Sequence, residues 1–209
     1  MTKNVFRFTL AVLTLSTAVT AFGRGATPKE LVIDLKFRPQ EGVTSHTAEI
    51  PPSMADKTVE IRIVDKRNES DPKVIGTGTG GDDKSFPIKA SLPIDPYIKD
   101  TLNAVAKDFG LKVVEKGGAR VLVVDVNKFH IDESNKALGS VYTANVKLGY
   151  TLKNGSKTLT EGADSGEAHR YGRAHSAENM NEVLSDALKE AFANVLNESR
   201  LQDAWSGKK

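Results

Sequence analysis

The sequence predicts an α+β protein, a two-layer sandwich in which two amphipathic helices cover one face of a mainly antiparallel sheet. Apolar residues recur at helical spacing after Asp95 and again after Ser176. The segment 142–152 alternates strictly between apolar and polar side chains, which indicates a strand with one dry face and one wet face. An Asn-Gly pair follows this strand and is typical of a tight hairpin.

The N-terminal residues have the pattern of a secretory signal peptide. Lys3 and Arg7 give a positive start, an apolar stretch over 8–18 follows, and small residues then offer a cleavage site near 21–23. The apolar stretch is too short to span a bilayer. We therefore expect a cleaved signal and a periplasmic protein, with peripheral association with the outer membrane as an alternative.

The composition narrows the functional classes. The chain has 29 basic and 27 acidic residues, and the expected signal removes two basic ones, so the mature protein is formally neutral. A neutral surface has no counterion-release term that favours nucleic acid. The sequence contains no cysteine, which excludes disulfides, thiolate metal sites, cysteine nucleophiles and an acylated cysteine as a lipid anchor.

The first half of the mature chain contains two predicted strands and a long loop. Apolar residues alternate with polar ones over 26–40 and again at Val59, Ile61 and Ile63. The polar stretch between them, with Pro51-Pro52, is interpreted as a connector. Gly, Asp, Ser and Pro predominate over 68–93, so we expect a long loop there, with at most a short strand at Val74-Ile75.

A helix is expected to begin at Asp95-Pro96, because aspartate accepts free amide hydrogens and proline fits the first turn. Gly110 is expected to end it. A strand at 111–115, a turn at Gly117-Gly118 and a buried strand at 121–126 follow. The apolar face of the helix consists of Ile98, Leu102, Val105 and Phe109.

The last part of the chain gives the strongest signals. Asn154-Gly155 predicts a type I′ turn between the strand 142–152 and a return strand over 157–168. Ser176 is expected to cap the final helix. The lone Trp205 beyond it fits either packing against the core or a contact with a partner. The helix carries an apolar stripe of Met180, Val183, Leu184, Ala187, Leu188, Ala191, Phe192, Val195 and Leu196.

A literal G-x-G-x-x-G pattern occurs at Gly76, Gly78 and Gly81. A dinucleotide site needs a helix that starts at the glycines, because the amide groups of its first turn hold the phosphates. Here the acidic pair Asp82-Asp83 follows the glycines, and Pro87 opposes a helix. We interpret the stretch as a mobile loop and expect no cofactor.

Polar residues gather where the return strand leads into the final helix, at Asp164, Glu167, His169 and His175. Their spacing matches no established metal-ligand pattern, and a solvated strand end accounts for them. His130, close to Asp132 and Glu133, is interpreted in the same way, at the exposed end of a strand. We expect no catalytic, cofactor-binding or metal-binding residue. A metal-dependent hydrolase at the cluster of Asp164, Glu167, His169 and His175 is the alternative.

Several segments together resemble a known family. They are Asp65-x-Arg67, the Ile75-Gly76 step, "KDFGLKVV", "ARVLVVDVNKFHID", "GSVYTANVKLGYTLKNGSKTLTEG" and "AHSAENMNEVLSDALKEAFANVL". Over Val59–Leu201 the chain is similar to the YajG-like family of bacterial envelope lipoproteins. The resemblance implies an exported α+β protein that binds partners and has no established catalytic residues. Members usually carry a lipobox cysteine, which this sequence lacks, so we expect no lipid anchor.

These observations divide the chain into a signal peptide (1–23), an N-terminal strand and linker (24–56), a YajG-like α+β domain (57–201) and a C-terminal tail (202–209). The leading hypothesis is a non-enzymatic periplasmic binding or adaptor protein with an envelope protein as its partner. One alternative is the hydrolase described above. The other is a carrier of a small molecule or glycan, on the wet face of the sheet or at the Gly-rich loop.

Overall fold

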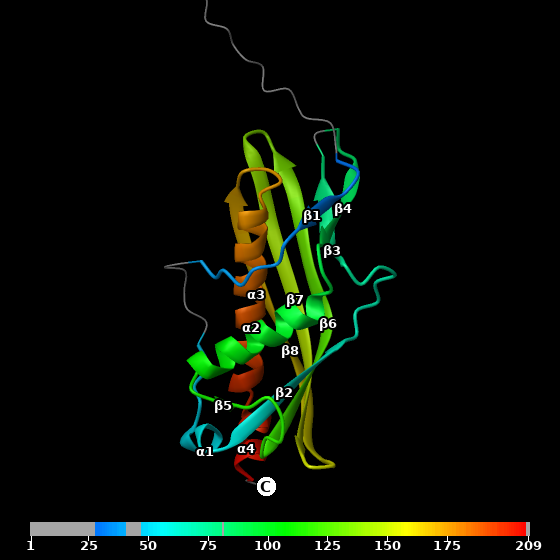
Figure 1. Ribbon diagram of the computed structural model, residues 1–209. Coiled ribbons are helices and arrows are strands. Elements are labelled where there is room, and N and C mark those ends of the chain that lie inside the picture. The colour runs from blue at the N-terminus through cyan, green and yellow to red at the C-terminus, as the bar shows by residue number, and fades with distance from the viewer. Residues whose placement is uncertain (1–27, 41–46, 81, 208–209) are drawn as a thin grey trace, which may run out of the picture.

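The computed structural model describes residues 28–40, 47–80 and 82–207, and it has one mixed sheet with helices on one face (Figure 1). The α+β prediction is confirmed, whereas the predicted signal peptide lies outside the described residues. The strands are β1 (Leu31–Ile33), β2 (Thr58–Asp65), β3 (Val74–Thr79), β4 (Ser85–Ala90), β5 (Lys112–Val113), β6 (Arg120–Lys136), β7 (Gly139–Asn154) and β8 (Lys157–Gly172). The helices are α1 (Pro52–Ala55), α2 (Ile94–Asp108), α3 (Ala177–Asn197) and α4 (Ser199–Ser206), and none has the length and hydropathy needed to cross a membrane.

Strand β6 is the centre of the sheet and is much longer than the predicted strand 121–126. One edge of β6 pairs with the antiparallel β7 along its whole length. The other edge pairs in parallel with β2 over Arg120–Val126 and then with β3 over Ile131–Glu133. A bulge between Val126 and Lys128 separates these two stretches. The sheet is therefore mixed, although its longest ladders, β6–β7 and β7–β8, are antiparallel as expected.

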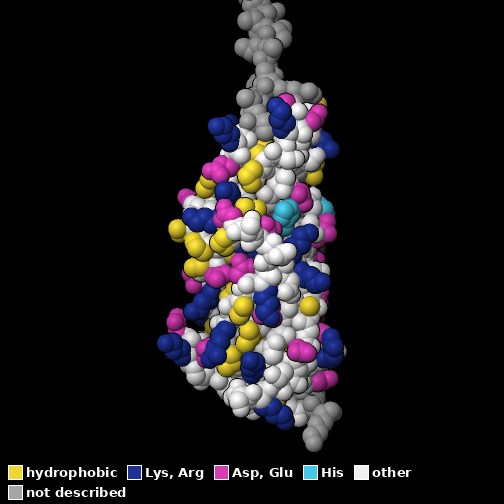
Figure 2. All heavy atoms as spheres, turned by 90° about the vertical axis from the view of Figure 1, so that its right-hand side faces the viewer, with side chains coloured by type: hydrophobic (Ala, Val, Ile, Leu, Met, Phe, Trp, Pro, Cys, Tyr) yellow, Lys and Arg dark blue, Asp and Glu magenta, His cyan; other side chains and the backbone are white. Residues whose placement is uncertain are grey.

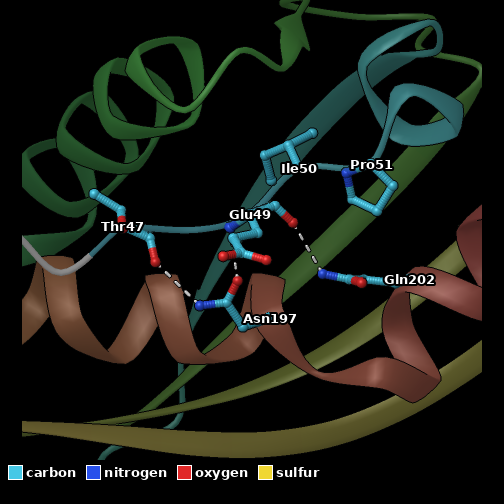
Figure 3. A pocket seen from close by; sticks show the side chains of 6 residues that line it. All are labelled: Thr47, Glu49, Ile50, Pro51, Asn197 and Gln202. Atoms are coloured by element: carbon cyan, nitrogen blue, oxygen red, sulfur yellow. Dashed lines mark hydrogen bonds between the residues drawn. The ribbon is translucent and has the colours of Figure 1, made fainter.

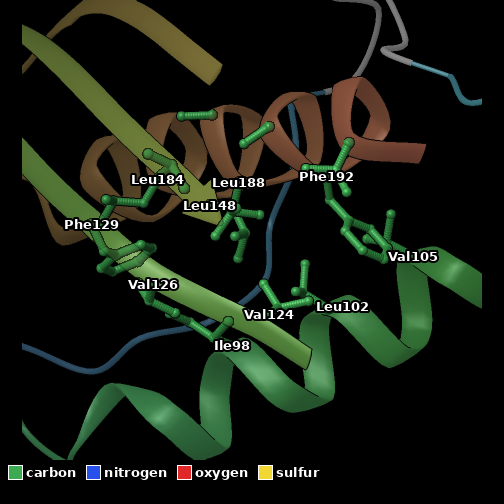
Figure 4. Packing of buried hydrophobic residues seen from close by; sticks show 14 of the residues in the cluster. Ile98, Leu102, Val105, Val124, Val126, Phe129, Leu148, Leu184, Leu188 and Phe192 are labelled. Carbon is green, nitrogen blue, oxygen red and sulfur yellow. The ribbon is translucent and has the colours of Figure 1, made fainter. Parts of the chain in front are cut away.

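The core lies between this sheet and helices α2 and α3, which both cover the same face (Figure 4). Helix α2 contributes Ile98, Leu102 and Val105, and all three are buried. The stripe predicted on α3 is buried throughout, from Met180 to Leu196. The inward residues of β7 are equally buried, which confirms the alternation seen in its sequence.

Helix α3 begins where predicted, because the Ser176 Oγ accepts a hydrogen bond from the amide of Asn179 at 3.3 Å. It also covers the middle of the free edge of β8. The amide of Glu167 donates to Glu190 Oε2 at 2.8 Å, and Asn194 Nδ2 donates to the Ser165 carbonyl oxygen at 3.0 Å. These side chains satisfy edge groups that would otherwise be open to another strand.

The expected loop 68–93 is largely a hairpin of β3 and β4, and the interpretation of its glycines as a mobile loop is wrong for Gly76 and Gly78. A Cβ atom on Gly76 would lie 2.0 Å from the carbonyl oxygen of Ile131, and one on Gly78 would lie 2.2 Å from the ring of Phe86. Both glycines are therefore required for close packing of strand on strand and of ring on strand. Gly81 lies outside the described residues.

The predicted strand 26–40 pairs with the sheet only over β1, and the following residues 34–40, here named the N-terminal strap, run along α3 instead. The side-chain amide of Asn181 forms two hydrogen bonds with the backbone of the strap. Its oxygen accepts from the Lys36 amide at 2.8 Å, and its nitrogen donates to the Asp34 carbonyl oxygen at 3.0 Å. Ser185 and Asp186 accept from the amides of Arg38 and Gln40 in the same manner. Strand-like alternation persists because Leu35 and Phe37 still pack against the core.

Two further differences concern turns and the C-terminus. The β7–β8 hairpin is confirmed, but its two central residues are Gly155-Ser156, since Asn154 still pairs with Lys157. Only Gly155 has positive φ, at 59°. The segment expected as a tail contains most of α4, and Trp205 on this helix is completely buried. Of the two interpretations of Trp205, packing against the core is the one observed.

Candidate functional site

The face of β6, β7 and β8 that points away from the helices is a broad polar surface. The residues that face the helices are mostly buried along β6 and β7 and mostly half-buried along β8. The alternate residues of all three strands are exposed or half-buried, except for Gly149, which is buried. We name this side the outer face. On the side of the molecule that Figure 2 shows, basic and acidic side chains are interspersed, with groups of apolar side chains between them.

The structure brings two of the predicted polar groups together on the outer face. Strand pairing aligns Asp132, Thr143 and His169 in one row across the three strands. It aligns His130, Asn145 and Glu167 in the next row. Each histidine lies beside a carboxylate of its own strand, at 3.2 Å for His130 Nε2 to Asp132 Oδ1 and 3.0 Å for His169 Nε2 to Glu167 Oε1. His130 is therefore within a long strand, and the expectation that it marks the exposed end of a strand is wrong.

The four residues of the metal hypothesis do not meet. Asp164 is on the helix-facing side of β8, while Glu167 and His169 point to the outer face. His175 lies beyond the end of β8 and contacts Glu133 on β6. Within residues 28–40, 47–80 and 82–207, no three His, Asp or Glu side chains are grouped so that they could hold a metal ion.

A buried polar cluster at the start of α3 was not predicted. Glu133, whose side chain has 0% exposure, accepts hydrogen bonds from the His175 amide at 2.7 Å and lies 3.0 Å from His175 Nδ1. The Tyr142 hydroxyl lies 3.1 Å from Glu133 Oε1 and accepts from the Ser176 amide at 3.0 Å. His175 itself has positive φ, at 56°. The cluster fixes the loop that leads into α3, so its role is structural.

The buried position of Tyr142 affects its ionisation. Burial raises the pKa of Tyr142 to about 12, and the carboxylate of Glu133 adds to the rise because it repels the phenolate. The pKa of Tyr150 is also raised, by burial and then by its hydrogen bond to Glu198. An unfolded chain loses the same phenolic protons near pH 10. The folded state thus retains protons that the unfolded state has lost.

We expect the free energy of unfolding to fall as the pH rises from 10 through 12. The stabilisation that protonated Tyr142 provides is complete below pH 10 and is lost as the pH rises through its folded pKa of about 12. The loss lowers the free energy of unfolding by about 1–3 kcal/mol. Tyr142→Phe should therefore flatten this part of the profile, measured by urea unfolding at several pH values. Tyr171→Phe, at a tyrosine that is 58% exposed, is the control. Parallel profiles for wild type and Tyr142→Phe would contradict the prediction.

A surface pocket of about 530 Å³ lies where the chain after the strap passes the junction of α3 and α4 (Figure 3). Its polar groups already bind one another. Asn197 donates to the Thr47 carbonyl at 3.1 Å and accepts from the Glu49 amide at 2.8 Å, while Gln202 Nε2 donates to the Glu49 carbonyl at 3.1 Å. These amides hold the extended chain to the helices, so the pocket is explained by the fold. Its lining consists of Thr47, Glu49, Ile50, Pro51, Asn197 and Gln202.

The Asp-x-Arg motif also has a structural explanation. The Arg67 side chain is 3% exposed and binds Asp65 through two nitrogens, with Nη2 at 2.8 Å from Oδ2 and Nε at 3.0 Å from Oδ1. Its remaining donors reach the carbonyl oxygens of Pro72 and Val74, both at 2.7 Å. One arginine thus fixes the connection between β2 and β3.

Comparison with solved structures shows the fold. The chain is similar to protein XCC0632 from Xanthomonas campestris, of the DUF330 family, with a TM-score of 0.51 and 11% identity over 85% of this chain and 98% of that chain. A PelC dodecamer from Paraburkholderia phytofirmans gives a TM-score of 0.37 at 12% identity, over 72% and 92% of the two chains. A minor lipoprotein from Acinetobacter baumannii gives 0.31 at 9% identity, over 71% and 92%.

Comparison of sequences shows the family. No curated protein matches the chain. Residues 44–205 match the model of a family described as uncharacterized lipoprotein, a span that includes the region 59–201 in which the motifs above were found. Membership places the chain among exported proteins of the cell envelope. The protein therefore belongs to the YajG-like family of uncharacterised bacterial lipoproteins, as its motifs predicted.

Proposed function

We propose that this protein is a non-enzymatic binding or adaptor protein of the periplasm, and that it docks an envelope protein on its outer face. The observation that carries the proposal is the outer face itself. Strands of 17, 16 and 16 residues form it, and helices α2 and α3 pack on the opposite side. No helix among residues 28–40, 47–80 and 82–207 packs on the outer face, so over this length the face is available to a partner.

The shape and chemistry of the outer face suit a protein more than a small ligand. Small-molecule sites are concave and largely apolar, with only a few polar groups. The outer face instead alternates donors and acceptors across neighbouring strands, from Thr143 and Asn145 in the centre to the imidazole–carboxylate pairs on both sides. A non-obligate protein interface is about as polar as the rest of a protein surface, so the polarity of the outer face is compatible with a protein partner. The protein partner is therefore preferred over the glycan carrier.

Site-specific photo-crosslinking in intact cells tests the proposal. A photoreactive amino acid placed at Asn145 or His169, on the outer face, is expected to give a discrete adduct with one envelope protein. The same residue at Lys99, which is exposed on α2, is the matched control and should give none. Adducts at Lys99 alone, or no adduct at any outer-face position, would contradict the proposal. An adduct with a glycan instead of a protein would also contradict it.

A further inference from the structure

One end of the molecule carries an apolar tip that neither packing nor turn formation explains. The β6–β7 hairpin turns through Ala137-Leu138, since Lys136 pairs with Gly139. Leu138 is 92% exposed, the highest exposure among the large apolar residues described. Two-residue turns usually contain Asn, Asp or Gly, and neither Ala137 nor Leu138 has the positive φ that such turns use.

The second hairpin of the sheet shows what the fold alone requires. The β7–β8 turn at the opposite end has the same two-residue length and contains Gly155-Ser156, with positive φ at Gly155. That composition follows turn preferences and places no apolar side chain in water. The aliphatic side chain at Leu138 is therefore not a consequence of hairpin geometry.

A tyrosine and two cations complete the tip. Tyr171, near the end of β8, is 58% exposed, and its ring lies across Gly139, because a Cβ atom there would be 3.0 Å from the Tyr171 hydroxyl. Lys136 and Arg173 flank this group, are exposed, and form no ion pair with any residue that the structure describes. On the neighbouring β3–β4 turn, Asp82 is paired with Lys84 at 2.9 Å and Asp83 is exposed.

We propose that this tip, formed by Lys136, Leu138, Tyr171 and Arg173, binds the surface of an anionic lipid bilayer. Leu138 enters the boundary of the acyl chains, and the Tyr171 ring lies at the level of the headgroups, where tyrosine is favoured. Lys136 and Arg173 lie farther from the bilayer than Leu138 and attract anionic headgroups. An aliphatic residue, an aromatic residue and unpaired cations at one convex point match a bilayer surface better than they match a flat polar protein face.

The orientation of the chain agrees with this occupant. The described chain enters β1 at the same end of the molecule as the β6–β7 turn (Figure 1). In a lipoprotein, acylation near the N-terminus holds that end of the domain at the membrane. This chain belongs to a lipoprotein family but contains no cysteine to acylate. Direct contact through the tip would keep the same end at the bilayer, independently of the protein partner proposed above.

Co-sedimentation of the mature protein with lipid vesicles tests the proposal. We expect binding to vesicles of phosphatidylethanolamine and phosphatidylglycerol, weaker binding to phosphatidylcholine alone, and a further loss as salt is raised. Leu138→Asp should weaken binding about tenfold or more. Leu92→Asp, at a leucine that is 71% exposed away from the tip, is the matched control and should bind like wild type. Lys136→Glu combined with Arg173→Glu should lose the preference for anionic lipid.

A spectroscopic measurement separates insertion from loose association. Leu138→Trp should shift its fluorescence to shorter wavelength when anionic vesicles are added, whereas Leu92→Trp should not, and the buried Trp205 gives a constant background. The proposal is overturned if wild type fails to sediment with anionic vesicles. It is equally overturned if Leu138→Asp and Leu92→Asp behave alike, which would assign the exposed leucine to a protein contact or to none.

Discussion

Phe192→Ala is expected to destabilise the protein by about 3–5 kcal/mol, and Leu188→Ala by about 2–5 kcal/mol. Both side chains have 0% exposure and project from α3 toward the space between the sheet and α2 (Figure 4). Either change removes apolar contacts and leaves a cavity that a rigid sheet on one side cannot close. The free energy of unfolding, measured by urea denaturation, gives both values directly.

Lys189→Ala provides the control on the same helix. Lys189 is only half-buried, so its truncation should change the free energy of unfolding by about 0.5 kcal/mol or less. If Phe192→Ala and Leu188→Ala were as mild as Lys189→Ala, then α3 would not form the core. The placement of the whole sheet against α3 would be wrong in that case.

Helix α3, which carries Leu188 and Phe192, and strand β7 show which parts of the fold a sequence can predict. The apolar stripe of α3 is regular over about five turns, and the alternation of β7 is regular over about ten residues, because one continuous face of each element is buried. The hairpin of β3 and β4 gave no such signal. Gly76 and Gly78 occupy the places where apolar side chains would show alternation, since there the backbone of β3 closely approaches Ile131 and the Phe86 ring.

The bulge in β6 explains why the polar cluster at Glu133 was missed. Before the bulge the even-numbered residues of β6 face the helices, as Val124 and Val126 do. After it the odd-numbered residues Ile131 and Glu133 take that position. A uniform alternation would have placed Glu133 in water. Its partners Tyr142 and His175 come from β7 and from the loop before α3, so spacing in the sequence could not connect the three.

The prediction of a strand over 26–40 is wrong for the N-terminal strap for a related reason. An extended segment with one apolar face alternates whether its backbone pairs with a strand or with side chains of a helix. Asn181 provides both a donor and an acceptor to one strap backbone, as a neighbouring strand would. Nothing in the sequence of the strap distinguishes these two partners. The partner is instead determined by the polar residues of α3, such as Asn181 and Ser185, which bind the backbone of the strap.

Gly166→Ala should have an effect about as large as a core truncation, although it adds an atom rather than removing one. A Cβ atom on Gly166 would lie 2.2 Å from the carbonyl oxygen of Ala187 and 2.5 Å from the amide nitrogen of Ala191. Both contacts are with the backbone of α3, so no side-chain rotation can relieve them and the helix must move away from β8. We expect a loss of about 3 kcal/mol in the free energy of unfolding.

Ala163→Val on the outer face of β8 is the matched control for Gly166→Ala. It adds more atoms to the same strand but places them in solvent, where a β-branched residue is well tolerated. Its effect should stay within about 0.5 kcal/mol. Amide hydrogen exchange gives a second readout, since displacement of α3 would break the bond from Glu167 N to Glu190 and speed exchange at Glu167. Unchanged stability together with unchanged exchange at Glu167 would mean that α3 does not approach β8 closely enough to require glycine. The helix would then leave the edge of β8 open to pairing with another strand.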